Sequence, residues 1–223
     1  MKYMTRIFIP WTMAVFILMI QVAMPCHASQ TLDDETAQIV SGIEAKYANK
    51  SFSADFEQAS HLTALDVTEM ATGKAWFSHP GKMKWIYNSS DNHEIITNGK
   101  NLWIYRPEEK QVMAGDAAPF FQSGSGGAFL ADIRKIREEF SIQPGNVKEN
   151  SVQLVLTPKK QTPELAKIRI TVALPSYEIP VVETENTYGD TTKFIFTNIQ
   201  FSTFDDQIFE FTPPLGTEII EID

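Results

Sequence analysis

Residues 94–105 read Glu94-Ile95-Ile96-Thr97-Asn98-Gly99-Lys100-Asn101-Leu102-Trp103-Ile104-Tyr105, and this stretch decides the fold. Two short runs rich in isoleucine and aromatic residues stand on either side of Asn98-Gly99. An Asn-Gly pair between such runs is the strongest short-range signal of a β-hairpin. The stretch therefore predicts two adjacent antiparallel strands joined by a tight turn.

The alternation of apolar and polar residues continues on both sides of this hairpin. It recurs before the hairpin at residues 52–56, 74–78 and 83–87, and after it at 153–157, 167–172, 181–187 and 192–197. A period of two residues is typical of strands that bury one face. The pattern predicts a mainly β fold with helices, built as one strongly curved antiparallel sheet with two helical pieces.

Two segments depart from the strand pattern. Apolar residues at helical spacing predict an amphipathic helix over about residues 33–48, on Ile39, Val40, Ile43 and Tyr47. Residues 114–128 carry Ala-Pro-Phe-Phe and then a glycine-rich run, and a short helical run follows over about 129–137. Apolar anchors beside a flexible lead are typical of a lid, and an ordinary crossover helix is the alternative.

The first 28 residues have the features of a secretory signal peptide. Lys2 and Arg6 precede an apolar run that ends at the small-residue site Cys26-His27-Ala28. We expect cleavage after Ala28 and one domain over residues 29–223, exported to a periplasm. A retained membrane anchor and a lipid-modified Cys26 are the alternatives. The mature chain would contain no cysteine, which excludes disulfides and thiol chemistry.

The charge of the chain restricts its partners. Cleavage would remove Lys2 and Arg6 from the 19 basic residues and nothing from the 28 acidic ones, so the net charge of −9 would fall to about −11. A surface of this sign disfavours nucleic acid and anionic membrane faces as partners.

Patterns of catalytic residues are absent from the sequence. The histidines His61, His79 and His93 do not stand at metal-ligand spacing, and no Gly-x-Ser-x-Gly elbow occurs. Adjacent carboxylates such as Glu138-Glu139 point to different sides of a strand or helix, so they cannot easily share a substrate. We expect no catalytic group, metal or cofactor. A hydrolase that uses scattered carboxylates is the alternative.

Aromatic and other large apolar residues instead occupy alternating strand positions. They are Phe52, Phe56, Trp76, Met83, Trp85, Trp103, Tyr105, Phe194 and Phe196. In a closed sandwich these residues would form an ordinary core, whereas in a half-open sheet the same residues would line a cavity. The residues alone leave both interpretations open.

The order of several motifs is similar to that of one known family. The motifs are Phe52-Ser-Ala-Asp-Phe-Glu-Gln58, Gly73-Lys-Ala-Trp76, Pro80 to Trp85, Asn98-Gly-Lys-Asn-Leu-Trp-Ile-Tyr105, Leu154-Val-Leu-Thr-Pro158 and Phe209-Glu-Phe-Thr-Pro-Pro-Leu-Gly216. In this order and spacing the chain resembles the periplasmic outer-membrane lipoprotein carrier family, LolA, over nearly the whole predicted mature chain.

The resemblance implies a fold and a function. It implies a half-open antiparallel β-barrel, closed by a helical lid, whose apolar cavity accepts the acyl chains of lipoproteins. It also implies a monomer that collects lipoproteins from an ATP-driven transporter of the inner membrane and passes them to a LolB-like receptor of the outer membrane. A binder or sensor of other lipids on the same fold is the alternative.

The resemblance also places candidate residues. It implies acyl-chain contacts for eight of them, with packing core as the competing interpretation: Phe52, Phe56, Trp76, Met83, Trp85, Trp103, Phe129 and Leu130. His79 stands just before Pro80, where well-studied members carry an arginine that latches the lid. Because an imidazole cannot replace an arginine fork, we expect lid closure to be weaker or to depend on pH near the ordinary histidine pKa of about 6.5.

Overall fold

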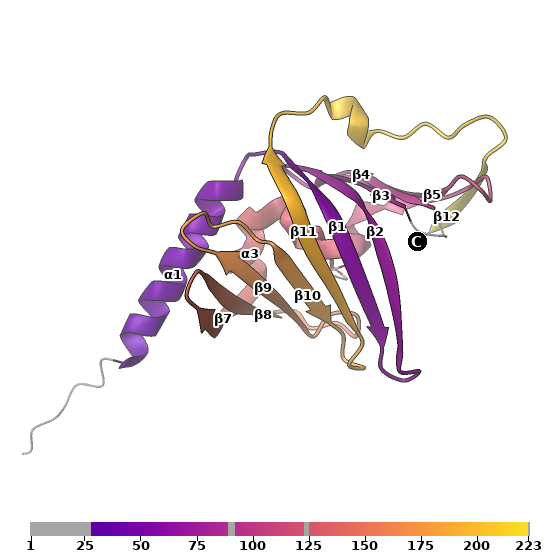
Figure 1. Cartoon of the computed structure of the whole chain (residues 1–223). Helices are drawn as coiled ribbons and strands as arrows, with labels where there is room; N and C mark the ends of the chain where they lie inside the picture. The colour runs from indigo at the N-terminus through magenta and orange to yellow at the C-terminus, as the bar shows by residue number, and fades with distance from the viewer. Residues whose placement is uncertain (1–27, 89–91, 123–124, 223) are drawn as a thin grey trace, which may run out of the picture.

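A computed structural model describes residues 28–88, 92–122 and 125–222 of this chain. In these residues one sheet of twelve strands has the order β12-β6-β5-β4-β3-β2-β1-β11-β10-β9-β8-β7. Neighbouring strands are antiparallel, except that β12 runs parallel to β6. Within this described part the terminal strands β12 and β7 are not paired with each other. The sheet is therefore curved, as the strand pattern predicted, and half-open (Figure 1), as the family resemblance implied.

The strands have the following bounds: β1 Phe52–Leu62, β2 Val67–Ser78, β3 Lys82–Tyr87, β4 Glu94–Asn98, β5 Asn101–Arg106, β6 Gln111–Asp116, β7 Phe140–Lys148, β8 Ser151–Pro158, β9 Lys167–Ala173, β10 Val181–Glu185, β11 Thr191–Phe201 and β12 Glu218–Ile222. The helices are α1 Ala28–Tyr47, α2 Ala117–Gln122, the 3₁₀ helix η1 Ser125–Lys135, α3 Ile136–Glu139 and the 3₁₀ helix η2 Asp206–Phe209.

The hairpin expected at Asn98-Gly99 is confirmed as β4 and β5. The Asn98 side chain accepts hydrogen bonds from the backbone N–H groups of Lys100 and Asn101, at 3.0 and 2.9 Å. Gly99 has a φ of +90°, a conformation that a side chain would strain. The other expected strand runs also lie in strands, whereas β6, β7 and β12 were not expected.

The helix expected over residues 33–48 is confirmed, although α1 begins earlier, at Ala28. The apolar residues that predicted it are all buried: Ile39, Val40, Ile43 and Tyr47. The predicted signal peptide lies outside the described residues except for Ala28. Among the helices of the described residues, none combines the length and the apolar character needed to cross a membrane.

Helices and loops cover the two faces of the sheet differently. The helices of residues 117–122 and 125–139, which are α2, η1 and α3 and are called the lid below, lie behind strands β11, β1 and β2 in Figure 1, and α1 lies to the left of these strands. Buried residues of the lid, of α1 and of the sheet form one hydrophobic cluster on this inner face. The C-terminal segment 202–217, in yellow, crosses the outer face, where η2 lies against β3 and β4.

Candidate functional site

The inner face of the sheet carries a continuous layer of aromatic side chains. Phe52 stacks on Phe77 with ring centroids 4.5 Å apart. The Trp85 ring lies 4.9 Å from that of Phe56, and the Trp85 indole N–H donates to the Met83 sulfur at 3.4 Å. All five side chains are nearly or completely buried. The adaptable thioether and the edge-to-face rings offer a smooth apolar surface.

Four of the eight candidate acyl-chain residues, Phe52, Phe56, Met83 and Trp85, belong to this layer. Leu130 is buried against it from the lid, and Phe129 is a half-buried lid residue at its margin. The structure therefore brings six of the eight candidates to one side of the sheet.

Trp76 and Trp103 lie on the opposite, outer face. Side chains alternate along a strand, and the buried residues Ala75 and Phe77 of β2 point inward, so Trp76 points outward. The Lys74 ammonium lies 5.5 Å from the centre of the Trp76 ring. Trp103 lies 6.4 Å from Phe211 of the C-terminal segment. Neither tryptophan is placed with the other six candidates.

The inner face also contains Phe77, Phe194 and Phe196, which are not among the eight candidate acyl-chain residues, although the alternation already placed Phe194 and Phe196 at possible cavity-lining positions. Phe77 contacts both Phe52 and Trp85, and Phe194 and Phe196 stack on each other beside Trp85. The strand register could have indicated them, because Phe56 is paired with Phe196 across β1 and β11. Residues paired in this way share a face of the sheet.

The inner side of the lid is as apolar as the sheet that it covers. Its buried side chains are Leu130, Ala131, Ile133 and Ile136, each at most 1% exposed. The longest element of the lid is the eleven-residue 3₁₀ helix η1. Such helices have poorer hydrogen-bond geometry than α-helices and are uncommon beyond three or four residues. The lid is therefore held in place by apolar packing more than by its own backbone.

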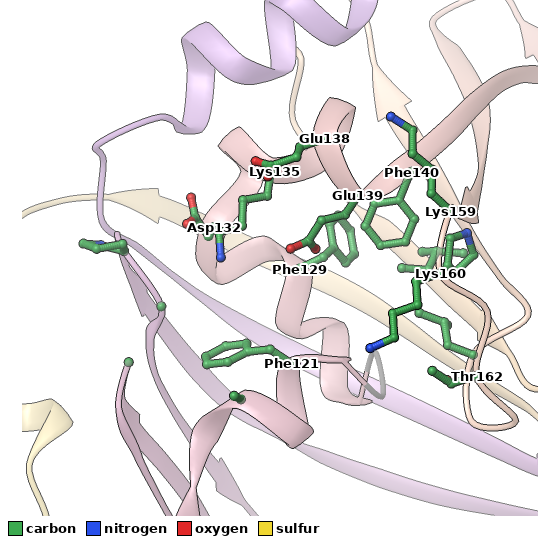
Figure 2. A pocket seen from close by; sticks show the side chains of 17 residues that line it. Phe121, Phe129, Asp132, Lys135, Glu138, Glu139, Phe140, Lys159, Lys160 and Thr162 are labelled. Atoms are coloured by element: carbon green, nitrogen blue, oxygen red, sulfur yellow. The ribbon is translucent and has the colours of Figure 1, made fainter.

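A pocket of about 620 Å³ opens beside the lid (Figure 2). Its apolar wall includes Phe121 and Phe129 of the lid and Phe140, Leu165 and Ile168 of the sheet side. The charged side chains around it come from the lid and from the segment after β8: Asp132, Lys135, Glu138, Glu139, Lys159 and Lys160. This volume lies in the range of ordinary ligand sites.

His79 lies against the lid, at the turn between β2 and β3. Its two ring nitrogens are buried and have no hydrogen-bond partner among the described residues. Burial lowers the pKa of His79 below 6.5, and Arg134 acts in the same direction. Asp132 and the Ala131 carbonyl raise this pKa in part, although the carbonyl does not reach hydrogen-bonding geometry with the ring.

A backbone contact joins the same turn to the lid. The Gly81 N–H donates to the Ala131 carbonyl at 2.9 Å. The turn that carries His79 is therefore joined to the lid by a main-chain hydrogen bond, which Gly81 rather than His79 makes.

Arg137 of α3 makes side-chain contacts that hold the lid to α1. Its guanidinium donates to the Glu44 carboxylate at 2.8 Å, to the Ser41 hydroxyl at 2.9 Å and to the Ala37 carbonyl at 3.0 Å. Lys159 in turn donates to the Arg137 carbonyl at 2.9 Å. This contact was not anticipated, because sequence alone does not bring Arg137 next to a helix about 100 residues earlier.

Known proteins resemble this chain over most of its length. A family model described as outer membrane lipoprotein carrier protein LolA matches residues 48–212. The outer-membrane lipoprotein carrier protein of Nitrosospira multiformis is 27% identical over 170 residues, which cover 75% of this chain and 80% of the relative. The protein of the same description from Nitrosomonas europaea is 28% identical over 177 residues, covering 78% and 85%.

A solved structure supports the fold. An uncharacterized conserved protein from Thermus thermophilus superposes with a TM-score of 0.54 at 7% sequence identity. The match covers 84% of this chain and 99% of that protein.

Proposed function

Because the chain belongs to the LolA family of outer membrane lipoprotein carrier proteins, we propose that it binds the acyl chains of lipoproteins between its lid and the inner face of its sheet. The observation that carries this proposal is the pairing of two apolar surfaces. The aromatic layer around Trp85 is covered by a lid whose own inner side chains, such as Leu130 and Ile133, are apolar. The family's carrier role thus has a physical counterpart in this chain.

In the closed state the lid occupies the surface that cargo would need. Leu130 and Ile133 fill part of the space above the aromatic layer, and the pocket beside Phe129 is the space left over. Acyl chains entering from this pocket would displace the lid side chains and take over their contacts. Loading therefore breaks the contacts of the closed lid, and unloading restores them. Because the free energy of these contacts opposes acyl-chain binding, the affinity stays moderate enough for release.

The energetics of acyl chains call for a donor and an acceptor. Burying an acyl chain is worth about 0.8 kcal/mol per CH₂ group, so a multiply acylated lipoprotein is held in a bilayer by tens of kcal/mol. A carrier whose lid side chains must be displaced by the cargo cannot extract a lipoprotein from a bilayer unaided. The route that we propose therefore begins at an ATP-driven transporter of the inner membrane and ends at a LolB-like receptor of the outer membrane, with the chain acting as a periplasmic monomer.

A release assay tests this function. Mature protein would be incubated with spheroplasts whose inner membrane holds radiolabelled, outer-membrane-destined lipoprotein and a matched transporter. We expect a soluble one-to-one complex of cargo and carrier, and its transfer to membranes that contain the receptor. If folded protein released no lipoprotein, the proposal would fail. Lipid that copurified with it would then identify a binder of another hydrophobic ligand.

A further inference from the structure

The inner face of the sheet changes its chemistry abruptly toward the β1–β2 hairpin. Phe56 and Phe194 belong to the aromatic layer, and the next inward positions on their strands are Gln58 on β1 and Thr192 on β11. Ser60 is paired with Thr192, which is paired in turn with Thr184 of β10. One step along each strand therefore replaces aromatic rings by uncharged polar groups.

These polar side chains form one connected belt. The Tyr87 hydroxyl donates to the Gln58 side-chain oxygen at 2.9 Å, and the Gln58 amide donates to the Ser60 hydroxyl at 2.9 Å. Ser60 and Thr192 share a hydrogen bond of 3.4 Å. The Thr184 hydroxyl donates to the Thr192 carbonyl at 3.5 Å. Except for the buried Tyr87, the members are half-buried and accessible.

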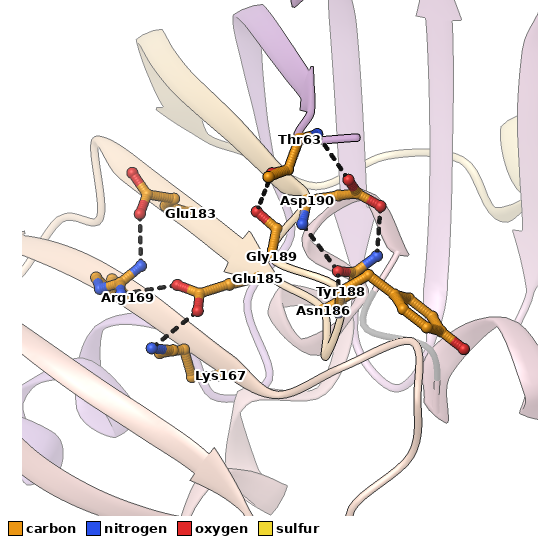
Figure 3. Close-up of polar contacts among 9 residues, drawn as sticks. All are labelled: Thr63, Lys167, Arg169, Glu183, Glu185, Asn186, Tyr188, Gly189 and Asp190. Atoms are coloured by element: carbon orange, nitrogen blue, oxygen red, sulfur yellow. Dashed lines mark hydrogen bonds and ion pairs between the residues drawn. The ribbon is translucent and has the colours of Figure 1, made fainter. Parts of the chain in front are cut away.

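The strands that carry the belt are tied to one another at the turns that follow it (Figure 3). Thr63, in the β1–β2 turn, donates through its N–H to Asp190 at 2.9 Å and through its hydroxyl to the Gly189 carbonyl at 2.6 Å. The Asn186 side chain accepts from the N–H groups of Tyr188 and Asp190. The β1–β2 hairpin is thereby tied to the β10–β11 turn.

The outer face secures β9 against β10. Arg169 pairs with Glu183 at 2.6 Å and with Glu185 at 2.8 Å, and Lys167 also pairs with Glu185 at 2.9 Å. These ion pairs point away from the belt, because Ile168 and Ile170 between them are the buried, inward residues of β9. The strands that carry the belt are therefore tied at their turn end and on their outer face.

We propose that the accessible members of this belt, Gln58, Ser60, Thr184 and Thr192, bind the ester and amide carbonyls through which acyl chains are joined to a lipoprotein, while the buried Tyr87 orients Gln58. The inference rests on the proposed function. Such a linkage is uncharged and rich in acceptor oxygens, and hydroxyl and amide donors match it. A ligand whose tails lie on the aromatic layer would place its linkage one step further along the sheet, where the belt lies.

The ionisable groups near the belt are compatible with an uncharged ester or amide linkage. Glu69 is paired with Ser60 on the adjacent strand and is exposed at the rim. Burial raises the pKa of Tyr87 well above its usual range, so its phenol stays protonated and keeps donating to Gln58 at every physiological pH. Polar groups of this kind set the orientation of a ligand that an otherwise apolar site would hold in any register.

Two synthetic probes test the belt. One is a cysteinyl lipopeptide with two palmitoyl chains in ester linkage, and the other is its dialkyl ether analogue, which has the same tails but lacks the two carbonyl oxygens. Affinities would be measured by competition with a fluorescent fatty acid. We expect wild type to prefer the ester about tenfold, the effect of one or two net hydrogen bonds.

Variants of the belt residues test whether the belt causes the preference for the ester over the ether. Combining Ser60→Ala with Thr192→Val should reduce the preference to about twofold or less and leave affinity for the ether unchanged. Thr192→Ser, which keeps the hydroxyl, should retain the preference. Thr72→Val is the matched control, because Thr72 lies on the outer face of β2. Thermal unfolding would check that each variant is folded.

Four results would overturn the inference. Equal wild-type affinities for ester and ether would show that the carbonyl oxygens are not bound. A loss of affinity for both probes in the double variant, or a lost preference in Thr72→Val, would show that the belt is only structural. If wild type bound neither probe, the proposed function itself would fail together with the belt, whereas ester and ether binding without preference would leave that function intact.

Discussion

Removal of the Arg137 side chain should open the lid. In Arg137→Ala the contacts to Glu44, Ser41 and the Ala37 carbonyl, which join α3 to α1, are all lost. The Arg137 side chain is 43% exposed. We therefore take the ion pair at the value for exposed pairs, below about 1 kcal/mol, and each of the other two hydrogen bonds at about 0.5 kcal/mol.

The sum of about 1–2 kcal/mol corresponds to a 5- to 30-fold rise in the ratio of open to closed lid. Trp85 is the natural reporter, since it is 1% exposed in the cluster that the lid helps to form. In mature protein with Trp76 and Trp103 replaced by phenylalanine, Trp85 is the only tryptophan after the predicted signal peptide. Acrylamide quenching of its fluorescence should increase in Arg137→Ala.

Arg134→Ala is the matched control for this experiment. Arg134 is a lid arginine of similar exposure, but its ion pair at 2.8 Å is with Asp132 of the same lid helix. Its removal should leave Trp85 as protected as in wild type. The role of Arg137 in closing the lid would be refuted if acrylamide quenched Trp85 in Arg137→Ala no more than in wild type. It would also be refuted if quenching of Trp85 increased equally in Arg134→Ala.

Three further predictions concern the latch turn and the sheet. Because the pKa of His79 is lowered in the closed state, its contribution to closure is complete above about pH 6.5 and is lost as the pH falls through the lowered pKa. Acrylamide quenching of Trp85 should therefore rise on acidification in wild type but not in His79→Ala. Matching quenching curves for the two proteins between pH 5.5 and 8 would contradict this. In urea denaturation, Phe77→Ala should lower the free energy of unfolding by about 3–5 kcal/mol, and Trp76→Ala by about 1 kcal/mol, because the two neighbours lie on opposite faces; equal losses would refute the placement of the faces. Gly73→Ala should cost about 1–3 kcal/mol by the same measurement, since its Cβ would collide with the Ile86 carbonyl and the Phe56 ring, and an unchanged stability would show that the strands can yield there.

The strands that sequence could predict are those with a clear period of two. The hairpin at Asn98-Gly99 was predicted from its turn chemistry and is confirmed as β4 and β5. Strand β7 escaped prediction because it contains Pro144 and Gly145 and is largely exposed at the edge of the sheet. Strand β12 escaped because its pairing with β6 is parallel and joins distant parts of the chain.

The face of each aromatic residue could not be read from alternation alone. In most half-buried sheets the apolar face is the inner face, which would place every tryptophan of a strand inside. Here the C-terminal segment covers part of the outer face, where Trp103 and Tyr105 contact Phe211. Aromatic residues therefore occupy both faces, and Trp76 and Trp103 lie on the face opposite to that of Trp85.

The contacts of the lid depend on folding rather than on local sequence. A helical run after a glycine-rich lead predicted a short helix over about 129–137, either a lid or an ordinary crossover helix, and the helical segments of residues 125–139 confirm the helix. The partner of Arg137 is a different matter, because Glu44 and Arg137 meet only when α1 and α3 are packed together. No pattern in either segment indicates the other.

Photo-crosslinking of acylated cargo would test the central claim most directly. A photoreactive amino acid would replace Phe56 or Leu130 on the inner side, and Trp76 or Trp103 on the outer face, in carrier loaded with lipoprotein bearing tritiated palmitate. We expect labelled adducts at the two inner positions and none above background at the two outer ones. Adducts at Trp76 or Trp103, with Phe56 and Leu130 unlabelled, would contradict it, because the acyl chains would then lie outside the lid.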